Sequence, residues 1–220
     1  MRIADIDRLN IIYFGEMNLP AWERAMRAEM ATAFEVIARA YLKAIQDILL
    51  SNKSENEKEA ALMMAAAAFS NEYKRFFDKW YSRYYTKLGG SNVESALEWR
   101  NEHSARLATW LVDTTRQTPT ADLSGRLRTQ IRTEINAICN LADFRALADS
   151  GMPYKRWHTH MDGKERPSHA DANRQIVPID EPFIVGGYMM MFPLDSSLGA
   201  PAEQIVNCRC IMTGAETLYG

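Results

Sequence analysis

The residues whose types and spacing could do chemistry lie near the C-terminal end of the sequence. They are three histidines and a Cys-x-Cys pair: His158, His160, His169, Cys208 and Cys210. Two side chains at alternate positions of an extended strand point to the same side, which would pair the first two imidazoles and the two thiols. Nitrogen and sulfur ligands in such pairs are what a tetrahedral zinc ion requires. The alternative is that the histidines hydrogen-bond to turns and the cysteines are small packing residues.

The same residues could also form a catalytic group. The Cys208 thiol could act as nucleophile, His169 as its base and Asp162 as the group that orients the imidazole. This arrangement would suit a small intracellular enzyme that acts on a nucleotide or a nucleic acid. The sequence contains no nucleophile elbow, phosphate-binding glycine loop or paired-carboxylate motif, so we do not expect an enzyme.

A second group of residues combines positive charge with aromatic rings. It occupies one stretch of the sequence and consists of Lys74, Arg75, Lys79, Trp80, Arg83, Tyr84 and Lys87. Such a stripe can contact nucleic acid through phosphate charges and base stacking, or it can anchor a partner protein. More often such a stripe is the buried and solvated faces of one helix, seen together in the sequence.

The elements that must position these residues divide near residue 150. Before it, apolar residues recur at three- and four-residue steps, which predicts four helices, over about 20–50, 56–88, 91–117 and 123–150. Ser91 and Glu94 have the spacing of a capping box for the third of these. Beyond residue 150 lie six of the eight prolines and seven of the eleven glycines, around short β-prone runs at 175–177 and 183–185. We therefore predict an α+β fold, with long N-terminal helices as a bundle or extended arm and a small C-terminal α+β module.

Length and composition limit the classes of protein that this chain could be. With 220 residues, 47% hydrophobic residues and a net charge of −2, it is typical of a globular protein and unlike a strongly basic nucleic-acid coat. No apolar run is long enough to span a membrane, and charged residues occupy the N-terminus where an export signal would be apolar. Three cysteines make a poor disulfide framework, so we expect a reducing cytoplasm as the site of synthesis.

The C-terminal motifs resemble those of the phage Mu F-like head morphogenesis proteins, also called minor capsid or minor head proteins. The resemblance runs from about Arg132 to Met212 and is carried by Asn140, Trp157, Asp162, Arg166, His169, Asn207, Cys208, Arg209 and Cys210. It places the F-like module at residues 126–220, after a helical region at 1–125. Some relatives have a cysteine pair where this chain has Arg166 and His169, and a His-Pro step in place of Ile205-Val206. A full zinc set would therefore have to recruit His158 or His160 beside His169, Cys208 and Cys210, and such a zinc would be structural.

The resemblance also implies a biological setting. It indicates a component of the virion head or procapsid that associates with the portal and assists capsid or procapsid assembly or genome delivery. Such a protein is made in the cytoplasm of the host bacterium and is present in few copies, and an enzyme is not implied. The partners it implies are the portal protein, capsid or scaffold proteins, phage DNA and other copies of this chain in the head, with no membrane.

Overall fold

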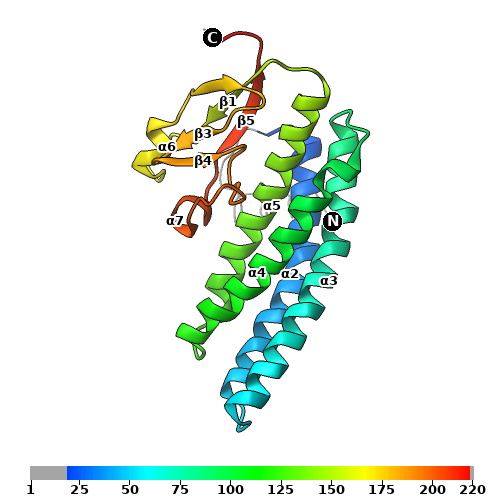
Figure 1. The fold of residues 1–220 in the computed structure, drawn as a ribbon, viewed down its shortest axis with the longest axis vertical. Helices are drawn as coiled ribbons and strands as arrows, with labels where there is room; N and C mark the ends of the chain where they lie inside the picture. The colour runs from blue at the N-terminus through cyan, green and yellow to red at the C-terminus, as the bar shows by residue number, and fades with distance from the viewer. Residues whose placement is uncertain (1–18, 219–220) are drawn as a thin grey trace.

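Four long helices stand side by side, and a small β region packs against one end of them (Figure 1). The computed structural model describes residues 19–218. The helices are α2 (Ala21–Leu50), α3 (Glu55–Lys87), α4 (Leu97–Gln117) and α5 (Leu123–Asp149). This arrangement confirms the predicted α+β class, with long N-terminal helices ahead of a small sheet region.

Local signals in the sequence set most of the helix ends. Proline precedes α2, since Pro20 is its N-cap residue. A full capping box starts α3, in which Glu57 N–H donates to the Ser54 hydroxyl and the Ser54 N–H donates to the Glu57 carboxylate. Asp122 caps α5 by accepting a hydrogen bond from the Ser124 N–H.

The predicted capping box at Ser91 and Glu94 is wrong. The chain enters α4 through a short 3₁₀ helix, η1 (Val93–Ala96), whose N-cap is Asn92 and carries no side-chain cap hydrogen bond. The backbone forms a tighter turn there, in which the Ser95 N–H donates to the Asn92 carbonyl at 3.3 Å and the Ser95 hydroxyl donates to the same carbonyl at 2.8 Å. The capping box that does form lies one helix earlier, at Ser54 and Glu57 of α3.

Aromatic side chains make up much of the bundle core. Tyr41 stacks on Phe69 with ring centroids 4.2 Å apart, and Phe77 stacks on Tyr81 at 5.0 Å. Trp99 of α4 lies 5.8 Å from Phe77 of α3, measured between ring centroids, which ties α4 into the same core. Large rings bury much apolar area each, so contacts such as Tyr41–Phe69 between α2 and α3 and Phe77–Trp99 between α3 and α4 help to hold the helices side by side.

The β region is built from short strands around one central strand. Strand β1 (Tyr154–His158) pairs antiparallel with β2 (Ile176–Pro178) on one side and with β5 (Ile211–Ala215) on the other. Strands β3 (Phe183–Val185) and β4 (Tyr188–Met190) form a separate antiparallel pair. The short helices α6 (Pro167–Asp171) and α7 (Ala202–Ile205) fill the connections.

Helix α5 contacts both parts of the molecule. It packs against α2 and α3 in the bundle and against β5 in the β region, and one cluster of buried hydrophobic residues runs through both. The division at residue 125 therefore separates stretches of sequence that share a core, and it stays a prediction. Among the described residues, no helix is long and apolar enough to cross a membrane.

Candidate metal centre

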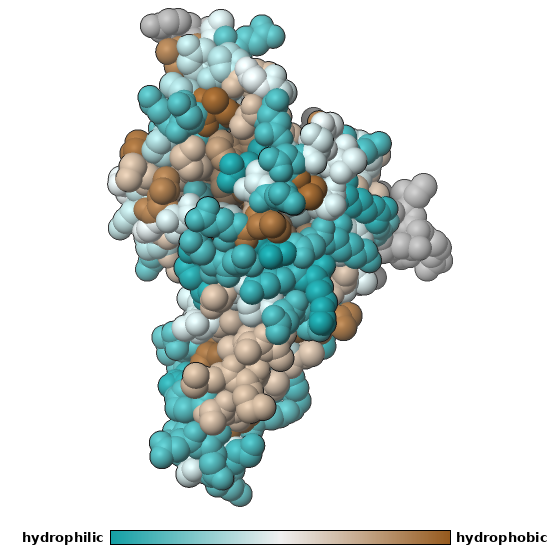
Figure 2. Space-filling view, turned by 45° about the vertical axis from the view of Figure 1, so that its right-hand side comes forward, coloured by the Kyte–Doolittle hydropathy of each residue, from teal (hydrophilic) through white to brown (hydrophobic). Residues whose placement is uncertain are grey.

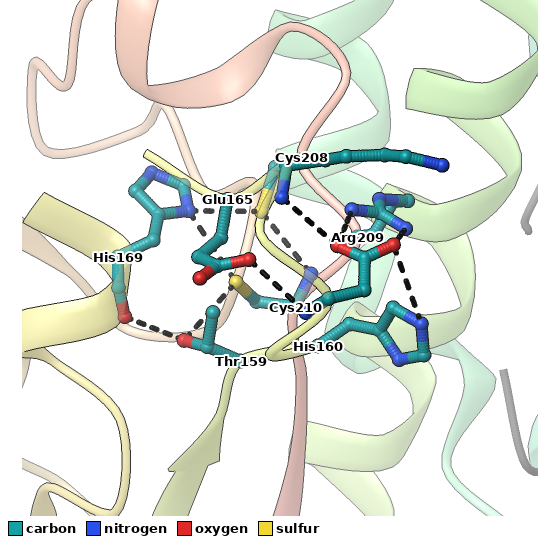
Figure 3. Close-up of polar contacts among 9 residues, drawn as sticks. Thr159, His160, Glu165, His169, Cys208, Arg209 and Cys210 are labelled. Atoms are coloured by element: carbon teal, nitrogen blue, oxygen red, sulfur yellow. Dashed lines mark hydrogen bonds and ion pairs between the residues drawn. The ribbon is translucent and has the colours of Figure 1, made fainter. Parts of the chain in front are cut away.

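The fold brings together His169, Cys208 and Cys210 (Figure 3). One ligand atom from each lies within 4.8 Å of the others, and all three side chains are buried. The His169 Nδ1 atom is 3.3 Å from the Cys210 Sγ atom and 3.5 Å from the Cys208 Sγ atom. Imidazole nitrogen and two sulfurs at such distances form a compact donor set for a soft or borderline metal ion.

The orientation of the His169 ring is set by α7. The His169 Nε2 atom lies 3.1 Å from the Gln204 side-chain oxygen, which also accepts a hydrogen bond from the Ser168 hydroxyl. Because an amide oxygen only accepts, it favours the tautomer with the proton on Nε2. The lone pair of Nδ1 then faces the two sulfur atoms, which is the arrangement that a metal-binding histidine needs.

The loop that carries both cysteines is fastened to α5. Asn136 Nδ2 donates to the carbonyls of Cys208 at 3.1 Å and Cys210 at 3.3 Å, and Asn140 Nδ2 donates to the Cys210 carbonyl at 3.1 Å. Arg27 of α2 donates to the Asn136 side-chain oxygen at 2.7 Å. The bundle thus fixes the backbone on which the two sulfur atoms are mounted.

Three of these anchoring residues were not found by the sequence analysis: Gln204, Asn136 and Arg27. Asn136 did leave a signal, because it lies four residues before Asn140 among the apolar positions of α5 and both side chains are buried. A polar pair at that spacing on an apolar helix face indicates that both side chains are buried and hydrogen-bonded to neighbouring groups. Gln204 and Arg27 have no comparable signal in the sequence.

The two thiols differ in their acidity. Hydrogen bonding by the Cys208 thiol lowers the pKa of Cys210. Burial raises the pKa of Cys208 well above its ordinary value. Cys208 therefore keeps its proton and donates it in the hydrogen bond to the Cys210 sulfur. A divalent cation would displace that proton, since only the thiolate is a metal ligand.

The other two histidines that the sequence offered as ligands lie outside this group. His158 is the last residue of β1, and its Nε2 atom lies 2.8 Å from the Thr213 hydroxyl oxygen. His160 lies beyond the end of β1, so the strand alternation that would have paired it with His158 does not reach it. Its Nε2 atom is 3.7 Å from an Asp162 carboxylate oxygen, at the rim of the cavity that the three clustered residues line.

Asp162 does not orient His169, so that part of the catalytic hypothesis is wrong. Its carboxylate oxygens accept hydrogen bonds from both terminal nitrogens of Arg209, at 2.7 and 2.8 Å. This paired guanidinium holds the pKa of Asp162 well below its usual range. Gln204 orients the His169 ring instead. The predicted proximity of the Cys208 thiol to His169 is present in the structure.

The remaining motif residues support the centre from outside. Trp157 is fully buried, its ring meets His169 edge-on at 5.9 Å, and its Nε1 atom donates to the Thr159 hydroxyl at 3.0 Å. Arg166 donates to the Val206 carbonyl. Asn207 takes a left-handed backbone conformation, with φ of 60°, and its N–H donates to the Thr133 hydroxyl at 3.1 Å.

The basic and aromatic stripe of α3 is divided between the core and the surface. Trp80 and Tyr84 are only 4% and 1% exposed, so the prediction that these rings could stack on bases is wrong. The charges of Lys79 and Arg83 lie over the Trp80 ring, at 4.9 and 5.3 Å from its centroid. An amphipathic helix that buries its aromatic face accounts for the pattern.

Comparison with known families gives one match. A family model described as Phage Mu protein F like protein matches residues 92–213, which is more than half of the chain. The match includes α4, α5 and the three clustered residues, and it begins well ahead of Arg132, where the recognisable motifs start. No curated protein and no solved structure gives a significant match.

Proposed function

The chain belongs to the phage Mu protein F-like family, and we propose that it is a minor head protein of a tailed phage or prophage. In this role it assists procapsid assembly through contact with the portal protein and resides in the virion head. The observation that carries the proposal is the family match, which covers both the centre and the α5 residues that fasten it.

An exposed apolar face on α3 supports a head contact. Met63 and Met64 are 72% and 75% exposed, and Ala60, Ala67 and Ala68 beside them are exposed as well. Figure 2 shows this part of the molecule as a continuous pale brown area in its lower half. A contiguous apolar patch on a surface is typical of a protein contact, and methionine adapts readily to a partner's shape. We place the portal contact here.

Quantitative mass spectrometry of purified heads tests the proposed role. The chain is expected at a few copies per head, beside the portal and major capsid proteins of the same particles. A double substitution, Met63→Glu with Met64→Glu, is expected to lower its incorporation, while circular dichroism shows that it remains folded. Val36→Glu is the matched control, because Val36 is an isolated apolar residue on α2 that is 69% exposed. Absence of the chain from both procapsids and heads would contradict the proposal.

We further propose that His169, Cys208 and Cys210 bind a structural zinc ion. Zinc bonds of normal length at a tetrahedral angle put a nitrogen and a sulfur about 3.5 Å apart, and the two such distances here are 3.3 and 3.5 Å. The metal would join α6 to the segment between α7 and β5. We expect about one zinc per purified chain, lost in His169→Ala and retained in His158→Ala, whose imidazole lies outside the group. Purified chains without bound zinc, or a β region whose stability does not change when zinc is removed, would contradict this assignment.

A further inference from the structure

The candidate centre offers three ligands where zinc takes four. Of the described residues, His169, Cys208 and Cys210 are the ones whose ligand atoms lie within 4.8 Å of one another, and no fourth histidine, cysteine or acidic residue joins them. Most structural zinc sites are closed by four protein ligands, whereas sites that exchange a ligand keep one position open. The surroundings of the fourth position therefore decide whether this stabilising zinc site is also open to an outside ligand.

The fourth position faces a cavity. All three clustered residues line one cavity of about 190 Å³, together with Lys164, Glu165, Arg166 and Arg209. On the other side, the backbone of the cysteine loop is fastened to α5 through the Cys208 and Cys210 carbonyls. Lys164 and Asn207 line the cavity and are exposed, so the cavity is open to solvent beside them.

The polar residues nearest to this position are engaged elsewhere (Figure 3). Glu165 accepts a hydrogen bond from the Asp162 N–H at 3.2 Å, and His160 faces the Asp162 carboxylate at 3.7 Å. Thr159 donates its hydroxyl proton to the His169 carbonyl at 2.5 Å, and its oxygen accepts from Trp157 at 3.0 Å and lies 3.6 Å from the Cys210 Sγ atom. Neither Glu165 nor His160 joins the group whose ligand atoms lie within 4.8 Å of one another.

The charge around the cavity favours a negative ligand. Two thiolates balance a divalent zinc ion, and the cavity carries Lys164, Arg166 and Arg209 against the acidic Glu165 and the Asp162 that is paired with Arg209. A small anion entering past Lys164 would meet a net positive rim.

We infer that the metal centre keeps an open fourth coordination position on the cavity side, which binds small anions in exchange with water. The inference rests on the proposed zinc site and deepens it, because an anion that enters the cavity could then bind the metal directly.

Cobalt substitution tests the open position with the full chain. Tetrahedral Co²⁺ has intense visible absorption that depends on each ligand, and azide is the anion used as probe. We expect Co²⁺ to bind at about one per chain, and azide to shift the visible bands in a saturable way. Glu165→Gln and His160→Ala are expected to leave the spectrum without azide unchanged. Lys164→Gln is expected to weaken azide binding several-fold.

The possible failures are distinguishable. A Co²⁺ spectrum that ignores azide and that changes in Glu165→Gln or His160→Ala means that this chain supplies the fourth ligand, which overturns the open position and keeps the metal site. A spectrum that ignores azide and is unchanged in both variants also overturns it. Failure of His169, Cys208 and Cys210 to bind Co²⁺ or Zn²⁺ at all overturns the metal site and the open position together.

Discussion

The helical bundle and the C-terminal β region are stabilised in different ways. Long helices bring large aromatic rings together in the bundle, as in the stacked pairs Tyr41–Phe69 and Phe77–Tyr81. The β region consists of strands of three to five residues, and the loop that carries Cys208 and Cys210 is held by side-chain hydrogen bonds from Asn136 and Asn140. The bundle therefore distributes its stability over many contacts, whereas the β region depends on a few specific ones.

The difference follows from element length. A helix of about thirty residues presents an apolar face over its whole length, so the loss of one contact leaves many others. Strands this short bury little area each, and a small sheet needs packing against other elements or a metal to be stable. In this molecule α5 provides the packing, and the proposed metal would provide the rest of the stability that the β region needs.

Removing the central ring of the β region is expected to have the largest effect. Trp157 is 0% exposed and contacts both His169 and Phe183. We expect Trp157→Ala to lower the free energy of unfolding by about 3–5 kcal/mol, measured by urea denaturation. Trp110→Ala in α4 is the matched control, because Trp110 is only partly buried. Equal losses in the two variants would argue against a special dependence of the β region on its core ring.

Breaking the link between bundle and loop should have the next largest effect. Asn136→Ala leaves two loop carbonyls and the buried Arg27 guanidinium without this partner. We expect a loss of about 2–4 kcal/mol, because buried polar groups are left unsatisfied. The variant is also expected to bind zinc more weakly. Asn71→Ala on the exposed face of α3 serves as control, and zinc binding unchanged in Asn136→Ala would refute the anchoring role.

The buried Lys155 should make the stability depend on pH. It is 0% exposed, and its Nζ atom lies 4.5 Å from the Phe144 ring centroid. Burial lowers the pKa of Lys155 to about 8, while Asp195 and Asp180 oppose that shift. Between about pH 8 and the ordinary lysine pKa of about 10.4 the unfolded chain holds more protons, so stability is gained as the pH rises.

The measurement is the stability difference between Lys155→Met and the unchanged chain at pH 7 and pH 9.5. The variant should be relatively more stable at pH 7 and lose that advantage at pH 9.5. The exposed-face substitution Lys79→Met should show no such change. A difference that is constant over this range would mean that Lys155 titrates normally.

Surface ion pairs of the bundle should matter least. Lys43 and Asp47 pair one helical turn apart on α2, with both side chains about 60% exposed. We expect Lys43→Gln to change the free energy of unfolding by less than about 0.5 kcal/mol. A larger change would show that the bundle, too, depends on individual polar contacts.

The two regions also differed in how far the sequence predicted them. The helices predicted over about 20–50 and 123–150 match α2 (Ala21–Leu50) and α5 (Leu123–Asp149), which begin directly after Pro20 and Asp122. The predicted runs at 175–177 and 183–185 coincide with β2 and β3 to within a residue. The class of the fold was therefore accessible from periodicity and turn residues alone.

The geometry of the centre was less accessible, because it depends on contacts between distant residues. Asn136 and Cys208 are 72 positions apart, and Gln204 reaches His169 across 35. The sequence identified the three clustered residues by type but could not separate them from His158 and His160. Which histidine joins the cluster depends on where β1 ends, and no local signal near His158 indicates that end. The burial of Trp80 and Tyr84 likewise depends on which face of α3 meets the other helices.

Hydrogen–deuterium exchange of the full chain, with and without a zinc chelator, tests most directly whether the two regions are stabilised differently. With zinc bound, the amides of β1, α6 and β5 are expected to be protected, and chelation should remove much of that protection. The amides of α2, α3 and the first half of α5 should stay protected throughout. Equal loss of protection in both regions, or no loss in the β region after zinc is removed, would contradict a metal-dependent β region beside a self-sufficient bundle.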